Sequence, residues 1–293
     1  MPNLTKIVRL VEQVYKASGF QEPTRRGKQK FSDLYICQLV VVQNLKGYAN
    51  ESAYLRYLRS HPSKTFSKIP SQQQYNQRSK RLGPTVECLT ATVLQRLKVY
   101  RTKIRIIDAT GIPVVKYYRR YSTKAFSDRR FFGIGYCAAK QERYYGEKLT
   151  LVTTREGIPV AYHLMPANRH DVKALKPAVQ NLTDVWLIGD KGYVGKKIHD
   201  DLKLQQRIRV ITPLRKNQHR TLTAWERKKL KYRKLIEVIN EQLKDHFGLE
   251  HLRAKSAVGT QSRIRNIIFS YALAVYFNKI NGRNLLSIKE ILG

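Results

Sequence analysis

The sequence predicts an α/β protein in which an all-helical N-terminal region precedes a sheet flanked by helices. Through the first hundred residues, apolar side chains recur at helical spacing between residues that typically begin and end helices. From residue 103, β-branched runs alternate with glycine-containing loops, which is typical of strands. After residue 170, expected helices and strands alternate along the chain.

The chain is long, apolar enough to fold, and strongly basic. It has 293 residues, with 56 Lys and Arg against 21 Asp and Glu, a formal net charge of +35. A hydrophobic fraction of 42% excludes a disordered basic tail. Because such an excess repels itself in a compact fold, we expect a nucleic acid partner. The most apolar stretch, residues 267–277, is shorter than the ~18 residues of a membrane-spanning helix, so we expect no membrane partner.

The N-terminal region is expected to contain four helices and to read DNA. Ser32 and Asp33 are typical N-cap residues, and Gly47 and Gly83 are typical helix ends. Residues 1–100 carry 17 Lys and Arg against 5 Asp and Glu. We therefore interpret residues 1–100 as a DNA-binding domain and 101–293 as a second domain; a helical subdomain that is basic like the rest of the chain is the alternative. The expected helices cover residues 31–46, 51–58, 71–82 and 85–99.

The second domain is expected to begin with an antiparallel meander. The first strand should end at Ala109, because Thr-Gly-Ile-Pro follows it and is typical of a turn. Expected strands cover residues 103–109, 130–139, 148–154, 159–165, 185–190 and 207–212, and expected helices lie near 195–204, 223–247 and 261–278.

Two aspartates end apolar strands in a chain with few acids. Asp108 follows a run of isoleucines, and Asp190 follows Val-Trp-Leu-Ile-Gly. The ends of strands in α/β sheets open onto the crevice where ligands bind. A half-buried carboxylate there is costly without a cation, so both are candidate metal ligands. The alternative is that each is a turn-forming Asp beside glycine.

A third acid lies on a polar stripe of a later helix. At ~100° per residue, Arg233, Glu237, Asn240 and Lys244 fall on one side, apart from the apolar face. A metal-binding carboxylate with phosphate-binding neighbours has this composition. The alternative is a solvated face with an ordinary Arg–Glu pair.

Taken together, the three acids suit two-metal phosphoryl transfer. Hard carboxylate oxygens hold Mg²⁺ ions about 3.5–4 Å apart, one at the attacking and one at the leaving oxygen. The sequence contains no Cys/His cluster, which favours Mg²⁺ over Zn²⁺.

The segments RIIDATG, WLIGDKGYVG and RKLIEVINEQLK, in this order, resemble the DDE transposases of bacterial insertion sequences. The segment ANRHDVKAL resembles the family's stretch before the second Asp, and the resemblance covers about residues 101–278. It implies a ribonuclease H-like catalytic core, a mixed sheet flanked by helices. One departure is Leu230, at the place where the helix signature of many relatives (Tyr-Arg-Glu-Lys) has its tyrosine.

The resemblance also implies roles for residues. Asp108, Asp190 and Glu237 would be the catalytic ligands of two Mg²⁺ ions, with Mn²⁺ as an alternative ion, while Arg233 and Lys244 would contact DNA phosphates. Residues 191–236 carry 15 Lys and Arg against 3 Asp and Glu, which indicates a DNA surface. The remaining residues assigned to DNA binding are Lys191, Arg227, Lys228, Lys229 and Asn240.

The function implied is cleavage of phosphodiester bonds at insertion-sequence ends, followed by joining of the 3′-OH to target DNA. Double-stranded DNA (terminal inverted repeats and target) is the implied partner, bound by a homodimer or larger assembly in the bacterial cytoplasm, at the nucleoid. A related metal-dependent nuclease or resolvase, and a catalytically inactive DNA-binding derivative, are the alternatives.

Several single residues have two interpretations. His170 and Asp171 either neighbour the active site or cap a helix, and capping is favoured. Tyr193 either faces the cleft or packs in the core. Trp225 suits base stacking, yet a core position is favoured.

Overall fold

The structure is a computed structural model that describes residues 2–23, 30–121, 124–138, 140–215 and 220–292 and divides into two compact units. The helical unit comprises Met1–Lys98 and Leu243–Gly293, and the sheet unit comprises Val99–Gln242. The first division lies close to the expected boundary at residue 100. The segment Leu243–Gly293, by contrast, groups with the N-terminal helices and not with the sheet.

The helical unit is assembled around its C-terminal helix. That helix, α10, is buried on nearly all sides and packs against α2 and α5, which explains why it groups with the N-terminal segment. In α2 the Oγ of Ser32 accepts a hydrogen bond from the Tyr35 N–H, the N-cap that the sequence predicts. The helices are α1 (Pro2–Ala17), α2 (Asp33–Leu45), α3 (Glu51–Ser60), α4 (Gln72–Arg81), α5 (Gly83–Arg96) and α10 (Ala257–Ile280).

Helix α1 is absent from the elements that the sequence analysis proposed. Its signal is present, because Ile7, Leu10, Val11 and Val14 recur at helical spacing and are all buried. Across the described part of the chain, no helix is both long and apolar enough to cross a membrane.

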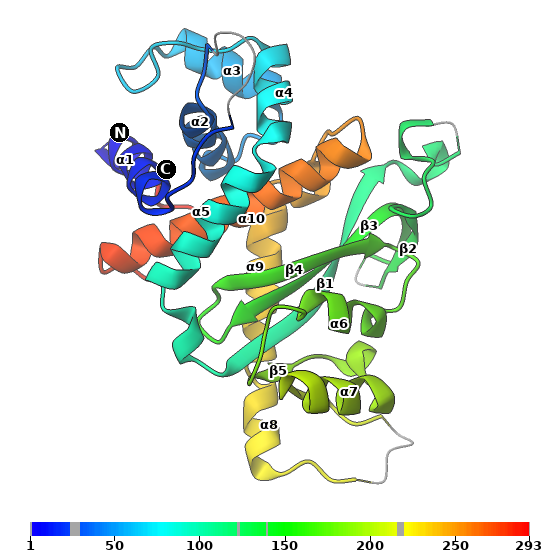
Figure 1. Cartoon of the computed structure of the whole chain (residues 1–293). Helices are drawn as coiled ribbons and strands as arrows, with labels where there is room; N and C mark the ends of the chain where they lie inside the picture. Colours follow the sequence, from blue (N-terminus) through cyan, green and yellow to red (C-terminus); the bar gives the residue numbers. More distant parts are fainter. Residues whose placement is uncertain (1, 24–29, 122–123, 139, 216–219, 293) are drawn as a thin grey trace. The chain divides into compact units, whose positions relative to one another are not determined.

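The sheet unit contains a mixed sheet of the predicted ribonuclease H-like class (Figure 1). Strand β1 is antiparallel to β3 and parallel to β5, and β5 is parallel to β6. Strand β3 pairs with β2 through its first part and with β4 through the rest. The strands are β1 (Ile104–Val115), β2 (Gly133–Cys137), β3 (Glu142–Thr154), β4 (Pro159–Pro166), β5 (Trp186–Ile188) and β6 (Arg209–Ile211).

Strand β1 does not end at Ala109, so the expected turn there is wrong. The strand pairs with β3 as far as Val115, with an irregularity between Pro113 and Val115. Gly111 is needed for space, since a Cβ at this position would lie 2.6 Å from the hydroxyl of Tyr144. Gly111 therefore leaves room for the Tyr144 ring to pack over β1, and it does not mark the end of the strand.

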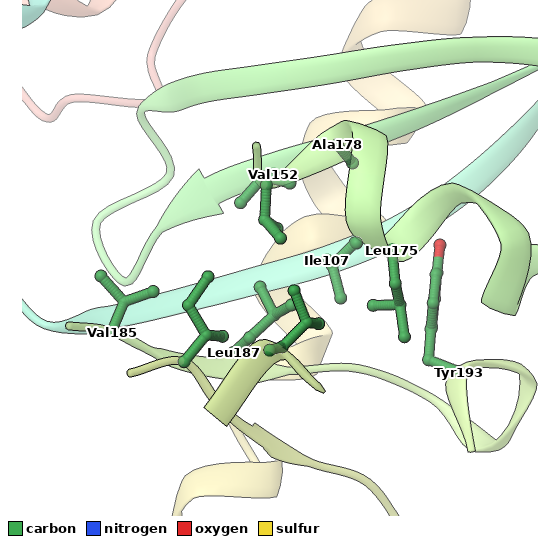
Figure 2. Packing of buried hydrophobic residues seen from close by; sticks show 10 residues of the cluster. Ile107, Val152, Leu175, Ala178, Val185, Leu187 and Tyr193 are labelled. Atoms are coloured by element: carbon green, nitrogen blue, oxygen red, sulfur yellow. The ribbon is translucent and has the colours of Figure 1, made fainter. Parts of the chain in front are cut away.

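Helices cover both faces of the sheet (Figure 1). On one face, Ile107 and Leu187 of the strands pack with Leu175, Leu202 and Tyr193 in one buried cluster, part of which Figure 2 shows. On the other face lie α8 and α9. The elements outside the sheet are η4 (Asp171–Ala174), α6 (Leu175–Ala178), η5 (Lys191–Tyr193), α7 (Lys196–Gln206), α8 (Ala224–Leu230) and α9 (Arg233–Asp245).

The single helix expected over residues 223–247 is two helices, α8 and α9. They pack on different parts of the sheet unit: Trp225 of α8 meets Trp186 edge to face, with ring centroids 4.1 Å apart, and Asn240 of α9 contacts Asp108. Residues 231 and 232, where α8 and α9 separate, include no Pro or Gly that would predict the break. We therefore attribute the break to tertiary packing, which overrides local helix propensity.

A cavity at the centre of the buried cluster should destabilise the protein. Leu187 is fully buried, whereas Leu204 on α7 is 84% exposed. We expect Leu187→Ala to lower the free energy of unfolding by about 2–5 kcal/mol in urea denaturation. The matched control Leu204→Ala should change it by less than about 0.5 kcal/mol. Equal effects of the two variants would contradict this packing.

Candidate active site

Strand register brings Asp108 and Asp190 together. In the parallel pair β1–β5, Ile106 lies opposite Ile188, and each aspartate follows two residues later. Asp190 keeps an extended backbone beyond β5. Because side chains two apart share a face of a sheet, the two carboxylates occupy neighbouring positions. Their charges interact, since Asp190 raises the pKa of Asp108.

Asp108 is a desolvated carboxylate held by two donors. Its Oδ2 accepts a hydrogen bond of 2.9 Å from the Asn240 Nδ2, and the Ala109 N–H donates to the same carboxylate. Burial raises the pKa of Asp108 to about 6. The negative charges of Asp190 and Asp171 act in the same direction, whereas the Arg233 guanidinium opposes them.

Glu237 lies on the stripe of α9 that faces Asp108. Arg233 and Asn240, which both act on Asp108, flank it at helical spacing. Its carboxylate Oε1 lies 4.0 Å from the Arg233 Nη2, and its side chain is 57% exposed. The structure thus places Glu237 on the expected helix face, with its carboxylate turned toward Arg233.

The donors suit a hard divalent cation, although they do not enclose one. Among the described residues, no group of three or more His, Cys, Asp or Glu side chains is placed to hold a metal ion. Asp108 nevertheless has the uncompensated burial that a cation would relieve. The Asn240 Oδ1 is also buried, with no hydrogen-bond partner in the described residues. Carboxylate and amide oxygens are ligands that Mg²⁺ accepts, so the residues fit such an ion.

Asp171 lies near Asp190, and its charge raises the pKa of Asp108. It does not cap a helix, so the favoured capping interpretation is wrong. His170 occupies the N-cap position of η4 without a side-chain cap hydrogen bond. The Asp171 Oδ1 instead accepts a hydrogen bond of 2.9 Å from the Lys148 Nζ. The sequence does not mark Asp171 as a site residue, because Asp171 does not directly follow an apolar strand as Asp108 and Asp190 do. Its signal was the general scarcity of acids in this chain.

The two aromatic residues in question both pack. Tyr193 is 1% exposed within the cluster of Figure 2. Burial raises the pKa of Tyr193 well above the usual value, and the charges of Asp108 and Asp171 add to the effect. Trp225 is partly buried against Trp186, and the Lys229 Nζ lies 5.3 Å from its ring centroid.

The residues assigned to DNA binding occupy different environments. Lys191, directly after Asp190, is exposed, as are Arg227 and Lys228 on α8. Asn240, by contrast, is 6% exposed, and its amide is occupied by Asp108. Lys244 belongs to the helical unit, where its Nζ lies 3.2 Å from the Glu250 Oε1.

The sheet order, the paired aspartates and the flanking helix that carries Glu237 are those of a ribonuclease H-like core. Residues 98–257 match a family model described as a transposase DDE domain, more than half of the chain. The chain therefore belongs to the family of DDE transposases. The match includes the segments that carry Asp108, Asp190 and Glu237. No curated protein and no solved structure matches the chain.

Neutralising Asp108 should stabilise the metal-free protein. Its pKa is about 6 in the fold, against ~3.9 in an unfolded chain. The protein therefore loses stability as pH rises through about 6, where Asp108 ionises in the fold. We expect Asp108→Asn in EDTA to raise the free energy of unfolding by about 1–3 kcal/mol at pH 7.5 and by much less at pH 4.5.

The measurement is chemical denaturation at the two pH values. Asp201→Asn is the control, because Asp201 is partly exposed and paired with Lys176. An Asp108→Asn protein no more stable than wild type at pH 7.5 would contradict the assigned burial cost.

Proposed function

We propose that this DDE transposase cleaves phosphodiester bonds at the ends of a bacterial insertion sequence and joins the freed 3′-OH to target DNA. It would act on nucleoid DNA in the cytoplasm. The observation that carries the proposal is the register of β1 and β5, which sets Asp108 beside Asp190, with Glu237 on the helix face toward them.

Asp108, Asp190 and Glu237 would hold two Mg²⁺ ions, or Mn²⁺ in their place. The chemistry that such ions supply when bound is activation of an attacking oxygen and stabilisation of charge on the leaving oxygen. For Glu237 to contribute, its carboxylate must turn away from Arg233, and its 57% exposure leaves that movement open.

The chain's own residues preorganise the acids. The Asn240 amide fixes one oxygen of Asp108, and the Gly192 N–H donates 2.8 Å to the Asp190 Oδ1. Each carboxylate thereby has one oxygen anchored, so less conformational freedom is lost when a ligand binds. The Arg233 guanidinium lowers the pKa of Asp108, which favours its ionised form.

DNA would bind across the basic surfaces. Lys191 extends from the turn that positions Asp190, so it would meet a phosphate next to the reacting one. Arg227, Lys228 and Lys229 would hold more distant backbone, and Arg233 and Lys244 would contact phosphates as in the family signature. The basic segment 1–100 would read the terminal repeat, and synapsis of two ends would require at least a homodimer.

Two other functions would give different products. A nuclease or resolvase on this core would cut DNA without joining a 3′-OH to a target. A catalytically inactive derivative would bind DNA in a salt-dependent manner without metal-dependent turnover.

Removing any one of the three acids should abolish catalysis. We expect Asp108→Ala, Asp190→Ala and Glu237→Ala each to reduce cleavage and strand transfer at least ~10³-fold, because each removes an electrostatic contribution of several kcal/mol. The assay uses DNA that carries the repeats flanking the coding sequence, with Mg²⁺. Asp201→Ala is the control and should retain activity. An active variant of any of the three acids would remove that residue from the site.

The basic residues of α8 should control the salt dependence of DNA binding. Replacing Arg227, Lys228 and Lys229 together by alanine should reduce the slope of log affinity against log salt by about 2–3, roughly one per lost phosphate contact. The charge-preserving control exchanges Arg and Lys at the same positions and should keep the slope. An unchanged slope in the alanine variant would exclude α8 from the DNA surface.

A further inference from the structure

Asp171 lies directly across Gly192 from the second metal-binding aspartate. A Cβ built on Gly192 would lie 2.9 Å from the Asp190 Oδ1 and 3.0 Å from the Asp171 Oδ2. The two carboxylate oxygens are therefore less than about 6 Å apart. The charge of Asp171 also reaches Asp108, whose pKa it raises. Asp171 thus adds a negative charge to those of Asp108 and Asp190.

A lysine is paired with Asp171. The Lys148 Nζ donates to the Asp171 Oδ1 at 2.9 Å and to the Arg169 carbonyl at 3.0 Å. Lys148 projects from β3, the strand paired with β1, and both members of the ion pair are largely covered, with side chains 21% and 27% exposed. The contact of the ammonium with the Arg169 carbonyl does not involve the Asp171 side chain, so we expect it to remain when Asp171 is altered.

The pair places opposite charges beside a cation site, and the two charges have opposite effects there. A carboxylate near the site strengthens binding of a divalent ion, whereas an ammonium weakens it. Because the two are joined, their effects largely cancel. An unpaired Lys148 would compete with the metal for the carboxylates, and an unpaired Asp171 would draw the ion more strongly.

We propose that the Lys148–Asp171 ion pair is a positioning pair that sets the divalent-ion affinity of the Asp108–Asp190–Glu237 site: Asp171 holds the ammonium of Lys148 and cancels its charge. This inference rests on the proposed metal-dependent function. It assigns Asp171 no direct bond to the metal.

The test is a charge cycle on the full-length protein without DNA. The readout is the Mg²⁺ or Mn²⁺ concentration that gives half of the maximal thermal shift. Asp171→Asn keeps the size of the side chain and leaves the positive charge of Lys148 uncompensated, so the half-maximal metal concentration should rise roughly three- to tenfold. Lys148→Met leaves the negative charge of Asp171 uncompensated, so the half-maximal metal concentration should fall by a similar factor. The double variant should return close to wild type.

Two controls separate this effect from a general loss of structure. The partly exposed pair Lys176–Asp201, with the Nζ 2.6 Å from the Oδ2, lies in the same unit, and Asp201→Asn and Lys176→Met should leave the metal concentration unchanged. The shifts at the Lys148–Asp171 pair should also shrink in high salt, because both side chains are partly exposed.

Each other outcome overturns the proposal. Shifts of the same sign in the two single variants would indicate a structural role. A loss of more than ~100-fold in Asp171→Asn, not restored in the double variant, would make Asp171 a ligand. If Asp171→Asn does not fold, Lys148→Met and Lys148→Gln decide alone, and unchanged or weakened metal binding in them refutes the proposal. If Asp108→Asn and Asp190→Asn fail to weaken metal binding, the proposed function itself is wrong.

Discussion

The parallel register of β1 and β5 is the constraint on which the site depends. Ile107 and Leu187 are buried on one face of these strands, and Ile106 and Ile188 are buried on the other. A one-residue slip of either strand would move its side chains to the opposite face and disrupt the packing on both. Core packing therefore fixes the pairing of Ile106 with Ile188. The same pairing forces two like-charged carboxylates together two residues later, so the hydrophobic core maintains an arrangement that electrostatics alone would oppose.

Hydrogen-bond donors around the acids offset part of the repulsion between their negative charges. Each aspartate has a specific donor: the Asn240 amide for Asp108, the Gly192 N–H for Asp190 and the Lys148 ammonium for Asp171. These donors stabilise the acids without removing the burial cost of Asp108, whose pKa stays raised. The raised pKa means that ionised Asp108 lowers the stability of the protein at neutral pH, and a cation bound as in the proposed function would offset that cost.

Sequence reasoning worked where one local signal dominated. The strand before Asp190 and the stripe with Glu237 follow from apolar periodicity alone, and the structure places each in the expected element. Sequence reasoning failed where the role of a residue depends on a side chain that is distant in the sequence. Gly111 resembles a turn residue until Tyr144 packs over it, and Asp171 resembles a cap until Lys148 reaches it from β3.

The sequence by itself determines the strong positive charge of the chain and the order of its strand–Asp, strand–Asp and helix–Glu motifs. Both can be recognised without a structure, because composition and periodicity are local properties. They were enough to predict the α/β class, and the resemblance of the three motifs to DDE transposases indicated the family. Only the tertiary structure decided which carboxylates lie together, that Asn240 is occupied by Asp108, and that α10 groups with the N-terminal helices. The physical reason is that strand register, burial and charge–charge coupling arise between residues far apart in the chain, where no local pattern encodes them.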